Sequence, residues 1–383
     1  MLNNNQFYST ILLFFSCTIL FSCKTAISIK SNESINFYIG TNSGDPQEGI
    51  YTYKMNLKNG QSEMISKYPN ILNPGYLALS NDGNNLYAIH SIKDEKESGL
   101  SAFKINKNTG TLELINHQST GGRGGCHISV TAEDDVVVAN YSSGSIAFLP
   151  TQKDGSLAKA TSKHTHSGSS VNKDRQKGPH AHFIQQGVGG LFYAVDLGID
   201  KIMLYKQVND ELVANNPPSI DMHPGAGPRH VDFHPNGKYV YVINELEGSV
   251  TGLKYNGNNQ PFEVLQTISS LPNGFADYNK SADIHIHPSG KYLYASNRGD
   301  HNSIAVYQID QNTGSLSLVE IENEAVAWPR NFALSPDGRF LLCANRDTDS
   351  VTFYDVDLKS GELKYTGKKV YAPKPICVKF DKL

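Results

Sequence analysis

Residues 229–244 read RHVDFHPNGKYVYVIN: an alternating apolar strand, a Pro-Asn-Gly turn, a second strand and a polar residue at its end. The same phrase returns as YLALSNDGNNLYAIH at residues 76–90, as DIHIHPSGKYLYASN at 283–297 and as RNFALSPDGRFLLCAN at 330–345. Degenerate copies cover residues 127–140 and 180–196. Short alternating strands joined by tight turns, repeated about every fifty residues, are typical of propeller blades.

The number of repeats follows from the polar residue that ends the second strand of each copy. It occurs at Thr41, His90, Asn140, Asp196, Asn244, Asn297 and Asn345, with spacings of 49, 50, 56, 48, 53 and 48 residues. Seven markers predict an all-β fold of seven four-stranded antiparallel blades. The first copy lacks an inner strand, and residues 376–380 form an inner strand without a blade. We therefore expect the C-terminal strand to complete the N-terminal blade and close the ring, which leaves no exposed sheet edge at the seam.

The composition fits one large β domain. The 383 residues include 33 Gly, 20 Tyr and 16 Phe, which suits many turns and many half-buried strands. We predict a single propeller over residues 35–383, because one blade cannot bury both of its faces alone. The net charge of -3 indicates no general attraction to nucleic acid or to an anionic membrane. We expect a monomer.

The N-terminus reads as a leader. Residues 7–21 form a nearly uncharged apolar run of fifteen residues, which is short for a membrane span but suits a signal-peptide core. The run ends in Leu20-Phe21-Ser22-Cys23, which resembles the lipobox of bacterial lipoproteins. We predict a signal peptide over residues 1–22, a lipid on Cys23 as the only membrane anchor, and a tether over residues 23–34. The protein would then lie on the periplasmic or cell-surface side. A plain secretory peptide, an uncleaved anchor and a cytoplasmic location are the alternatives.

Three cysteines, Cys126, Cys343 and Cys377, fall in the predicted domain. Their number is odd and their spacing matches no metal motif, so we expect buried free thiols.

Charged and polar residues gather at one end of the repeat. In a propeller the first strand of each blade lines the central channel, so the loops that lead into these strands share one mouth with the ends of the second strands. These positions carry His127, His180, His182, Asp196, Arg229, Asn244, Glu245, Arg298 and Arg330. Structural need alone would place Ser, Thr or small apolar residues there, so we predict that this set converges on one cavity.

Several linked phrases carry a family resemblance. They are GSSVN at residues 168–172, RQKGPHAH at 175–182, GPRH at 227–230, VINE at 242–245 and SNRG at 296–299. In this order they resemble the seven-bladed propeller lactonase family, which includes the propeller type of 6-phosphogluconolactonase and the fungal carboxy-muconate lactonising enzymes. The resemblance covers essentially the whole predicted domain. It implies a small-molecule lactone as ligand, with His182 or His180, Arg229, Glu245 and Arg298 at the catalytic and substrate-binding positions.

The chemistry of these residues suits those roles. Lactone hydrolysis needs a base to activate water, a role for histidine or Glu245, and cationic donors for the oxyanion that develops. Arginine forks at positions 229, 298 and 330 suit a carboxylate, a phosphate or the oxyanion, so we expect an anionic or polyhydroxylated substrate. We add His127, Asn244 and Asp196 as substrate-binding candidates.

Structural alternatives stay open for several of these residues. Arg229 and Glu245 could form a structural pair between blades, and His127 and Asp196 could merely line the channel. The polar segment 162–177, with His164 and His166, is expected to be a solvated loop or a lid over the mouth.

The His-x-His patterns also raise the question of a metal. No carboxylate cluster accompanies them at matching depth, so we predict neither a metal nor a cofactor.

Three functions fit the sequence. The favoured one is a lactonase acting on a sugar-derived lactone; the others are a muconate-type lactonising cycloisomerase and a non-enzymatic binding platform. Because a phosphorylated sugar should be scarce outside the cytoplasm, export favours an unphosphorylated aldonolactone or another lactone.

Overall fold

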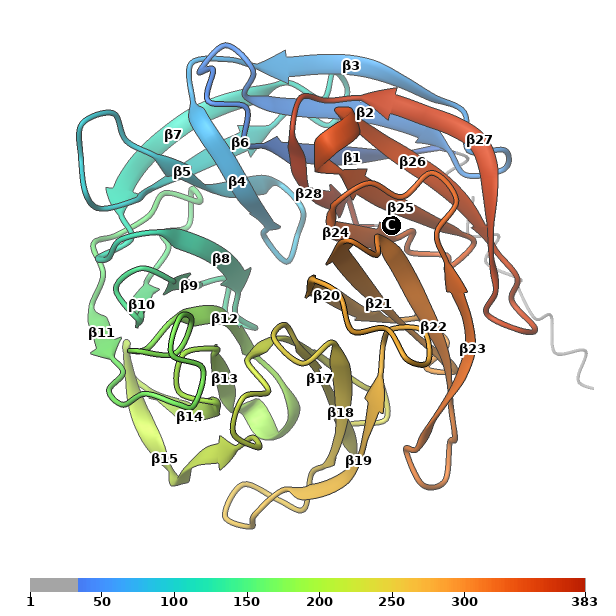
Figure 1. Cartoon of the computed structure of the whole chain (residues 1–383). Coiled ribbons are helices and arrows are strands. Elements are labelled where there is room, and N and C mark those ends of the chain that lie inside the picture. The colour runs from blue at the N-terminus through green and yellow to red at the C-terminus, as the bar shows by residue number, and fades with distance from the viewer. Residues whose placement is uncertain (1–33, 383) are drawn as a thin grey trace, which may run out of the picture. The chain divides into compact units, whose positions relative to one another are not determined.

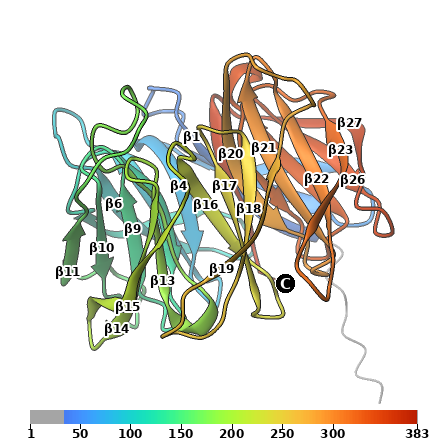
Figure 2. The same cartoon turned by 60° about the horizontal axis from the view of Figure 1, so that its bottom comes forward.

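Seven four-stranded antiparallel sheets make up residues 34–382, the part of the chain that this computed structural model describes. The sheets stand around a central channel, and Figure 1 views this ring nearly along the channel. Figure 2 shows the blades from the side, standing next to one another. The predicted seven-bladed propeller is confirmed. Cys23, the signal peptide and nearly all of the tether lie outside the described residues.

The first blade joins the two ends of the propeller. Its inner strand is β28 (Pro375–Phe380), which pairs with β1 (Ser34–Thr41), followed by β2 (Ile50–Asn56) and β3 (Ser62–Tyr68). The register places Phe380 opposite Phe37 and Val378 opposite Ile39. The C-terminal strand therefore closes the ring, as the orphan inner strand in the sequence predicted.

The other six blades run in chain order from the inner to the outer strand. Blades two to four consist of β4 (Leu72–Leu79), β5 (Asn85–Ser91), β6 (Gly99–Ile105) and β7 (Leu112–Ser119); β8 (Gly125–Val130), β9 (Val136–Asn140), β10 (Ser145–Leu149) and β11 (Ser162–Thr165); and β12 (Ala181–Gln186), β13 (Phe192–Asp196), β14 (Lys201–Val208) and β15 (Glu211–Asp221). Blades five to seven consist of β16 (Pro228–Phe233), β17 (Tyr239–Asn244), β18 (Ser249–Lys254) and β19 (Glu263–Ser269); β20 (Asn279–Ile286), β21 (Tyr292–Gly299), β22 (Ser303–Ile309) and β23 (Leu316–Glu322); and β24 (Pro329–Leu334), β25 (Phe340–Asn345), β26 (Ser350–Val356) and β27 (Leu363–Tyr371). Two 3-10 turns cover Val188–Gly190 and Arg346–Thr348.

One predicted segment is corrected by this architecture. Residues 162–165 form β11, the outer strand of the third blade, and not part of a solvated loop. His164 Nε2 lies 2.6 Å from the carbonyl oxygen of Leu212, and His166 is buried against Asp196. The polar composition of this segment reflects an edge strand, whose side chains are only half buried.

The core lies between neighbouring blades. The second strands β9, β13 and β17 are buried along their whole length, because both faces of a blade pack against other blades. This explains their runs of Val, Ile and Tyr without polar alternation. Tyrosines on second strands also reach the next blade: the hydroxyl of Tyr241 donates to the carbonyl of Gly314 at 2.8 Å, and that of Tyr294 to Gly361 at 2.9 Å.

Each of the seven loops that lead into inner strands contains a residue with positive φ. These residues include Asn70, Gly124, Gly168, Gly227, Gly274, Trp328 and Lys374. At Trp328, with φ of 54°, the left-handed backbone is strained, as is common at functional sites. The turn bends each loop into the channel, which brings residues from separate blades to one mouth.

Among the described residues no helix is long and apolar enough to cross a membrane.

Candidate active site

Glu245 lies at the centre of three guanidinium groups. Its Oε1 is 2.8 Å from Nη2 of Arg175, and its Oε2 is 3.0 Å from Nη2 of Arg298 and 3.0 Å from Nε of Arg229. The side chains of Glu245, Arg229 and Arg298 are 3%, 2% and 5% exposed. One carboxylate thus joins residues from two neighbouring blades and from the segment before β12.

The local backbone explains how Arg229 and Glu245 meet. Gly227 has φ of 61°, and a Cβ there would lie 2.3 Å from the side chain of Leu246, so this position requires glycine. The carbonyl of Gly227 accepts a 2.7 Å hydrogen bond from the backbone N–H of Glu245. The start of β16 is therefore tied to the end of β17, which places the two side chains together.

The charge of Glu245 is held by its partners. Burial alone would raise the pKa of this carboxyl group, but Arg298, Arg229 and Arg175 lower it to about 2. Glu245 is consequently ionised at neutral pH.

His182 is the histidine on the wall of the Glu245 site. It is buried on β12, and burial together with Arg229 and His230 lowers the pKa of its imidazole well below the ordinary value. Its Nδ1 lies 3.8 Å from Sγ of Cys126, and no hydrogen bond to Nε2 is formed by residues 34–382. Burial raises the pKa of Cys126 to about 12, so its sulfur is a neutral thiol. The imidazole is neutral and keeps one ring nitrogen for a ligand.

Two adjoining pockets open at this end of the channel. The Glu245 pocket, about 340 Å³, is lined by Arg175, His182, Glu245, Lys280, Arg298 and Arg330 together with Tyr141, Ser142 and residues 124–126. The Arg346 pocket, about 320 Å³, is lined by Arg229, Arg330, Arg346, Tyr76 and His90 together with smaller and polar residues. Gly124, Gly125, Cys126 and Arg330 belong to both, so the two pockets form one basin. Six cations face one carboxylate in it, and such a field attracts anions.

Arg330 is the guanidinium group available to a ligand. Within residues 34–382 it forms no ion pair, although it lies on the walls of both pockets. Burial and the charge of Arg229 lower its pKa to about 10, so it remains a cation at neutral pH. Arg346 is held differently: its guanidinium carbon lies 4.2 Å from the ring centre of Trp328, which fixes it at the edge of the Arg346 pocket.

Four predicted site residues are placed elsewhere. His180 stacks on Tyr141 with ring centres 4.4 Å apart, and its Nδ1 lies 3.1 Å from the backbone oxygen of Tyr141. His127 is buried against Tyr76 and Phe183. None of the residues His127, His180, Asp196 and Asn244 lines either pocket.

Asp196 and Asn244 have structural partners. Asp196 accepts the backbone N–H of His180 at 2.7 Å and lies 2.7 Å from Nδ1 of His166. Asn244 donates to Ser249 and Thr251. These hydrogen bonds fix the segments next to the site residues His182 and Glu245.

Sequence reasoning missed Arg175 as a member of the site. Arg175 belongs to the phrase RQKGPHAH, so the sequence contained the signal, but the polar stretch around it suggested a solvated loop. In the structure Gln176 is buried and donates to the carbonyl of Leu197, which anchors the segment and directs Arg175 to Glu245. Lys280 was also not predicted as a wall residue.

In residues 34–382 no group of three or more His, Cys, Asp and Glu side chains is arranged to hold a metal ion. Cys126, Cys343 and Cys377 are free, as predicted, but only Cys343 and Cys377 are fully buried, since Cys126 lies on the walls of both pockets.

Comparison with known proteins identifies a matching family. The model of the family described as Lactonase, 7-bladed beta-propeller matches residues 36–380. A 6-phosphogluconolactonase of Bacillus subtilis is 36% identical over 345 residues, which are 90% of this chain and 97% of that protein. A 6-phosphogluconolactonase of Formosa agariphila is 35% identical and covers 83% of this chain and 91% of its own. The structure of a periplasmic gluconolactonase from Pseudomonas aeruginosa matches with a TM-score of 0.85 and 29% identity, over 91% of this chain and 99% of that one.

Proposed function

Since the chain belongs to the seven-bladed β-propeller lactonase family, we propose that it hydrolyses the ring ester of a sugar-derived lactone, either 6-phosphogluconolactone or an unphosphorylated aldonolactone. The observation that carries this proposal is the buried carboxylate of Glu245 surrounded by three arginines beside the neutral imidazole of His182. This arrangement supplies a base and fixed cationic donors in the basin that the two pockets form.

In the reaction a water molecule attacks the carbonyl carbon of the lactone. His182, through Nε2, accepts the proton of this water, and the guanidinium groups of Arg229 and Arg298 stabilise the oxyanion of the tetrahedral intermediate. The bond to the ring oxygen then breaks, and the imidazolium returns its proton to that oxygen. The product is the open-chain hydroxy acid. Glu245 holds the two arginines in place, and it can orient the attacking water through an acceptor oxygen.

The excess positive charge of the basin connects binding to this chemistry. In the free site burial and the nearby arginines keep the pKa of His182 low, which makes the imidazole a weak base. An anionic substrate that contacts Arg330 and Arg346 offsets part of this charge and raises the basicity of His182. The Arg346 pocket is accordingly the place for the polyhydroxylated chain, or the phosphate, of the substrate.

A direct test measures hydrolysis of phosphorylated and unphosphorylated aldonolactones by proton release, with spontaneous hydrolysis subtracted. We expect Arg229→Met and Glu245→Gln each to lower kcat/KM at least about a hundredfold, the scale of a lost oxyanion partner. Arg339→Met is the matched control, because Arg339 lies away from both pockets and pairs with Asp337. Near-normal turnover in both folded variants would overturn the site assignment.

We propose, further, that the protein is exported and anchored by a lipid on Cys23. The lipobox-like sequence supports this, as does the periplasmic location of the Pseudomonas aeruginosa relative. Mass spectrometry of the membrane fraction should find a diacylglyceryl group on Cys23, and Cys23→Ser should abolish it. Recovery of the unprocessed full-length chain from the cytoplasmic fraction would rule the proposal out.

A further inference from the structure

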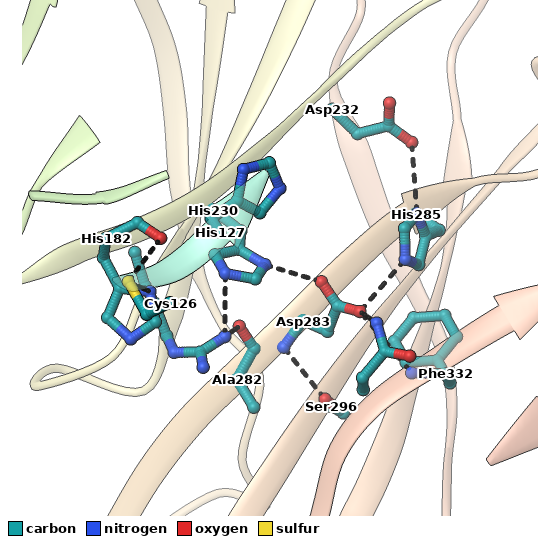
Figure 3. A network of polar contacts seen from close by, with 12 residues as sticks. Cys126, His127, His182, His230, Asp232, Ala282, Asp283, His285, Ser296 and Phe332 are labelled. Carbon is teal, nitrogen blue, oxygen red and sulfur yellow. Dashed lines mark hydrogen bonds and ion pairs between the residues drawn. The ribbon is translucent and has the colours of Figure 1, made fainter. Parts of the chain in front are cut away.

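A chain of alternating charged and imidazole groups runs down the channel from Arg229. Nη1 of Arg229 lies 3.2 Å from Nε2 of His230, and Nδ1 of His230 lies 2.7 Å from Oδ1 of Asp283. Oδ2 of Asp283 in turn lies 3.0 Å from Nε2 of His285. Figure 3 shows His230, Asp283 and His285 pointing toward one another, with Asp232 beyond His285. Of these residues, only Arg229 lines one of the two pockets.

The partners of His230 decide its protonation. A guanidinium nitrogen can only donate, so Nε2 of His230 must carry the lone pair that accepts from Arg229. Nδ1 therefore carries the hydrogen and donates it to the carboxylate of Asp283. Burial and the charge of Arg229 lower the pKa of His230 to about 3, which agrees with a neutral ring at working pH.

Asp283 is itself fixed from several sides. Besides the two histidines, the amide of Asn331 donates to Oδ2, and the backbone N–H of Asp283 donates to Ser296 Oγ at 3.0 Å. These groups come from β16, β20, β21 and β24, so the carboxylate is held by three blades. Its position cannot shift without moving inner strands.

Arg229 has a second fixed contact on the same nitrogen. Nη1 also donates to the backbone oxygen of Ala282, the residue before Asp283. Its Nε lies 3.0 Å from Oε2 of Glu245, but this ion pair lacks hydrogen-bond geometry, because Nε is buried without a hydrogen-bond partner in residues 34–382. The two acceptors of Nη1, the carbonyl of Ala282 and Nε2 of His230, therefore fix the plane of the guanidinium group together, and loss of the His230 acceptor would leave only one of them.

We propose that His230 and Asp283 are positioning residues: Asp283 selects the His230 tautomer that accepts from Arg229, and this contact aims the guanidinium group at the reacting carbonyl. The proposal rests on the lactonase function given above. A competing explanation is that His230 and Asp283 only tie β16 to β20. The two explanations predict different behaviour for two substitutions at one position.

The experiment compares His230→Gln with His230→Asn. The Gln amide oxygen can occupy the place of Nε2 and accept from Arg229, but it leaves Asp283 without its donor. The Asn amide N–H can occupy the place of Nδ1 and keep the hydrogen bond to Asp283, but it leaves Arg229 without its acceptor. We expect His230→Asn to lower kcat about ten- to a hundredfold with little change in KM, since misplaced catalytic groups cost rates of this order. We expect His230→Gln to keep kcat within about threefold of the wild type.

Stability should follow the opposite order. Since Asp283 loses a buried donor only in the Gln variant, His230→Gln should have the lower melting temperature. If kcat follows the order of stability, or both variants keep wild-type kcat, the positioning role is overturned. In an Arg229→Met background, His230→Asn should lower kcat no further, and an additive loss would also overturn the proposal.

A spectroscopic measurement on the wild-type protein does not depend on the variants folding. The ¹⁵N shifts of labelled His230 should show a neutral ring protonated at Nδ1, and protonation at Nε2 would overturn the proposal. Absence of any lactone turnover by the wild type would overturn the lactonase function and this role with it. Normal wild-type turnover with equal Asn and Gln variants would overturn the positioning role alone.

Discussion

Arg330 differs from the other arginines of the basin in having no anionic partner among residues 34–382. Arg175, Arg229 and Arg298 share Glu245, and Arg346 pairs with Asp347 at 2.7 Å. A half-buried cation with no fixed partner suits the anionic group of the substrate proposed above, because it would lose no ion pair on binding. At the scale of single residues, this separates the arginines that are paired with a carboxylate from the one that is not.

Replacing Arg330 should therefore change substrate preference more than the chemical step. For Arg330→Met we expect KM for the phosphorylated lactone to rise at least about tenfold, because a charge-assisted contact is lost. KM for the unphosphorylated lactone should change less than about threefold. Steady-state kinetics on both substrates, with Arg339→Met as the control, measure the difference. Equal losses on the two lactones would show that Arg330 does not hold the phosphate.

At the scale of elements, tyrosines join two of the second strands to the hairpin of the next blade. Tyr241 and Tyr294 donate to Gly314 and Gly361, in the hairpin turns that follow β22 and β26. These glycines have φ of 76° and 83°, which the turn requires. The hydroxyl of Tyr38 on β1 is equally buried but has no hydrogen-bond partner within residues 34–382. The chain thus contains a paired and an unpaired tyrosine on equivalent strands.

This difference gives a matched pair of substitutions. Tyr294→Phe should lower the free energy of unfolding by about 1 to 2 kcal/mol, because the carbonyl of Gly361 loses its buried donor. Tyr38→Phe should leave stability unchanged or raise it slightly, because an unsatisfied hydroxyl is removed from the core. Urea unfolding of both variants checks the prediction. A similar loss in both would mean that packing of the ring edge, and not the hydrogen bond, decides stability.

At the scale of the whole molecule, ring closure buries many histidines in and near the channel. Burial lowers the pKa of His90, His127, His182, His230 and His301, whereas neighbouring carboxylates raise the pKa of His223 and His285. The folded protein therefore binds fewer protons than the unfolded chain just below neutral pH. A closed ring responds to this difference as one cooperative unit.

We expect stability to fall as the pH is lowered from about 6.5 to 5. A histidine with a lowered folded pKa contributes stability above its unfolded pKa of about 6.5 and loses it as the pH falls toward the folded pKa. Each additional proton that the unfolded chain binds lowers the free energy of unfolding by about 1.4 kcal/mol for every pH unit of acidification. His223 and His285 act in the opposite direction, since their contribution is present below pH 6.5 and is lost as the pH rises through their folded pKa values.

Denaturant unfolding at several pH values between 7.5 and 5 measures the slope. His127→Phe removes one of the buried histidines from an aromatic cluster. It should reduce the dependence of the free energy of unfolding on pH by the contribution of at most one proton. A free energy of unfolding that stays constant or rises over this range would contradict the buried neutral state of these rings.

The repeat pattern by itself determined the number of blades, the closure of the ring by residues 376–380 and the end of the channel at which Arg229, Glu245, Arg298 and Arg330 meet. These features follow from local signals, because strand alternation and Pro/Asn/Asp-Gly turns recur in each repeat and the symmetry of a propeller carries them to equivalent places.

The tertiary structure alone decided which histidine faces the pocket. His180 precedes β12 and a register shift lies between Ala181 and Phe183, so simple alternation does not govern these positions. It also decided that Arg175 contacts Glu245, that Asp196 holds a loop, and that His230 acts between Arg229 and Asp283. These contacts join residues far apart in the chain, and their geometry depends on bulges and loop packing that only exist once neighbouring blades are in place.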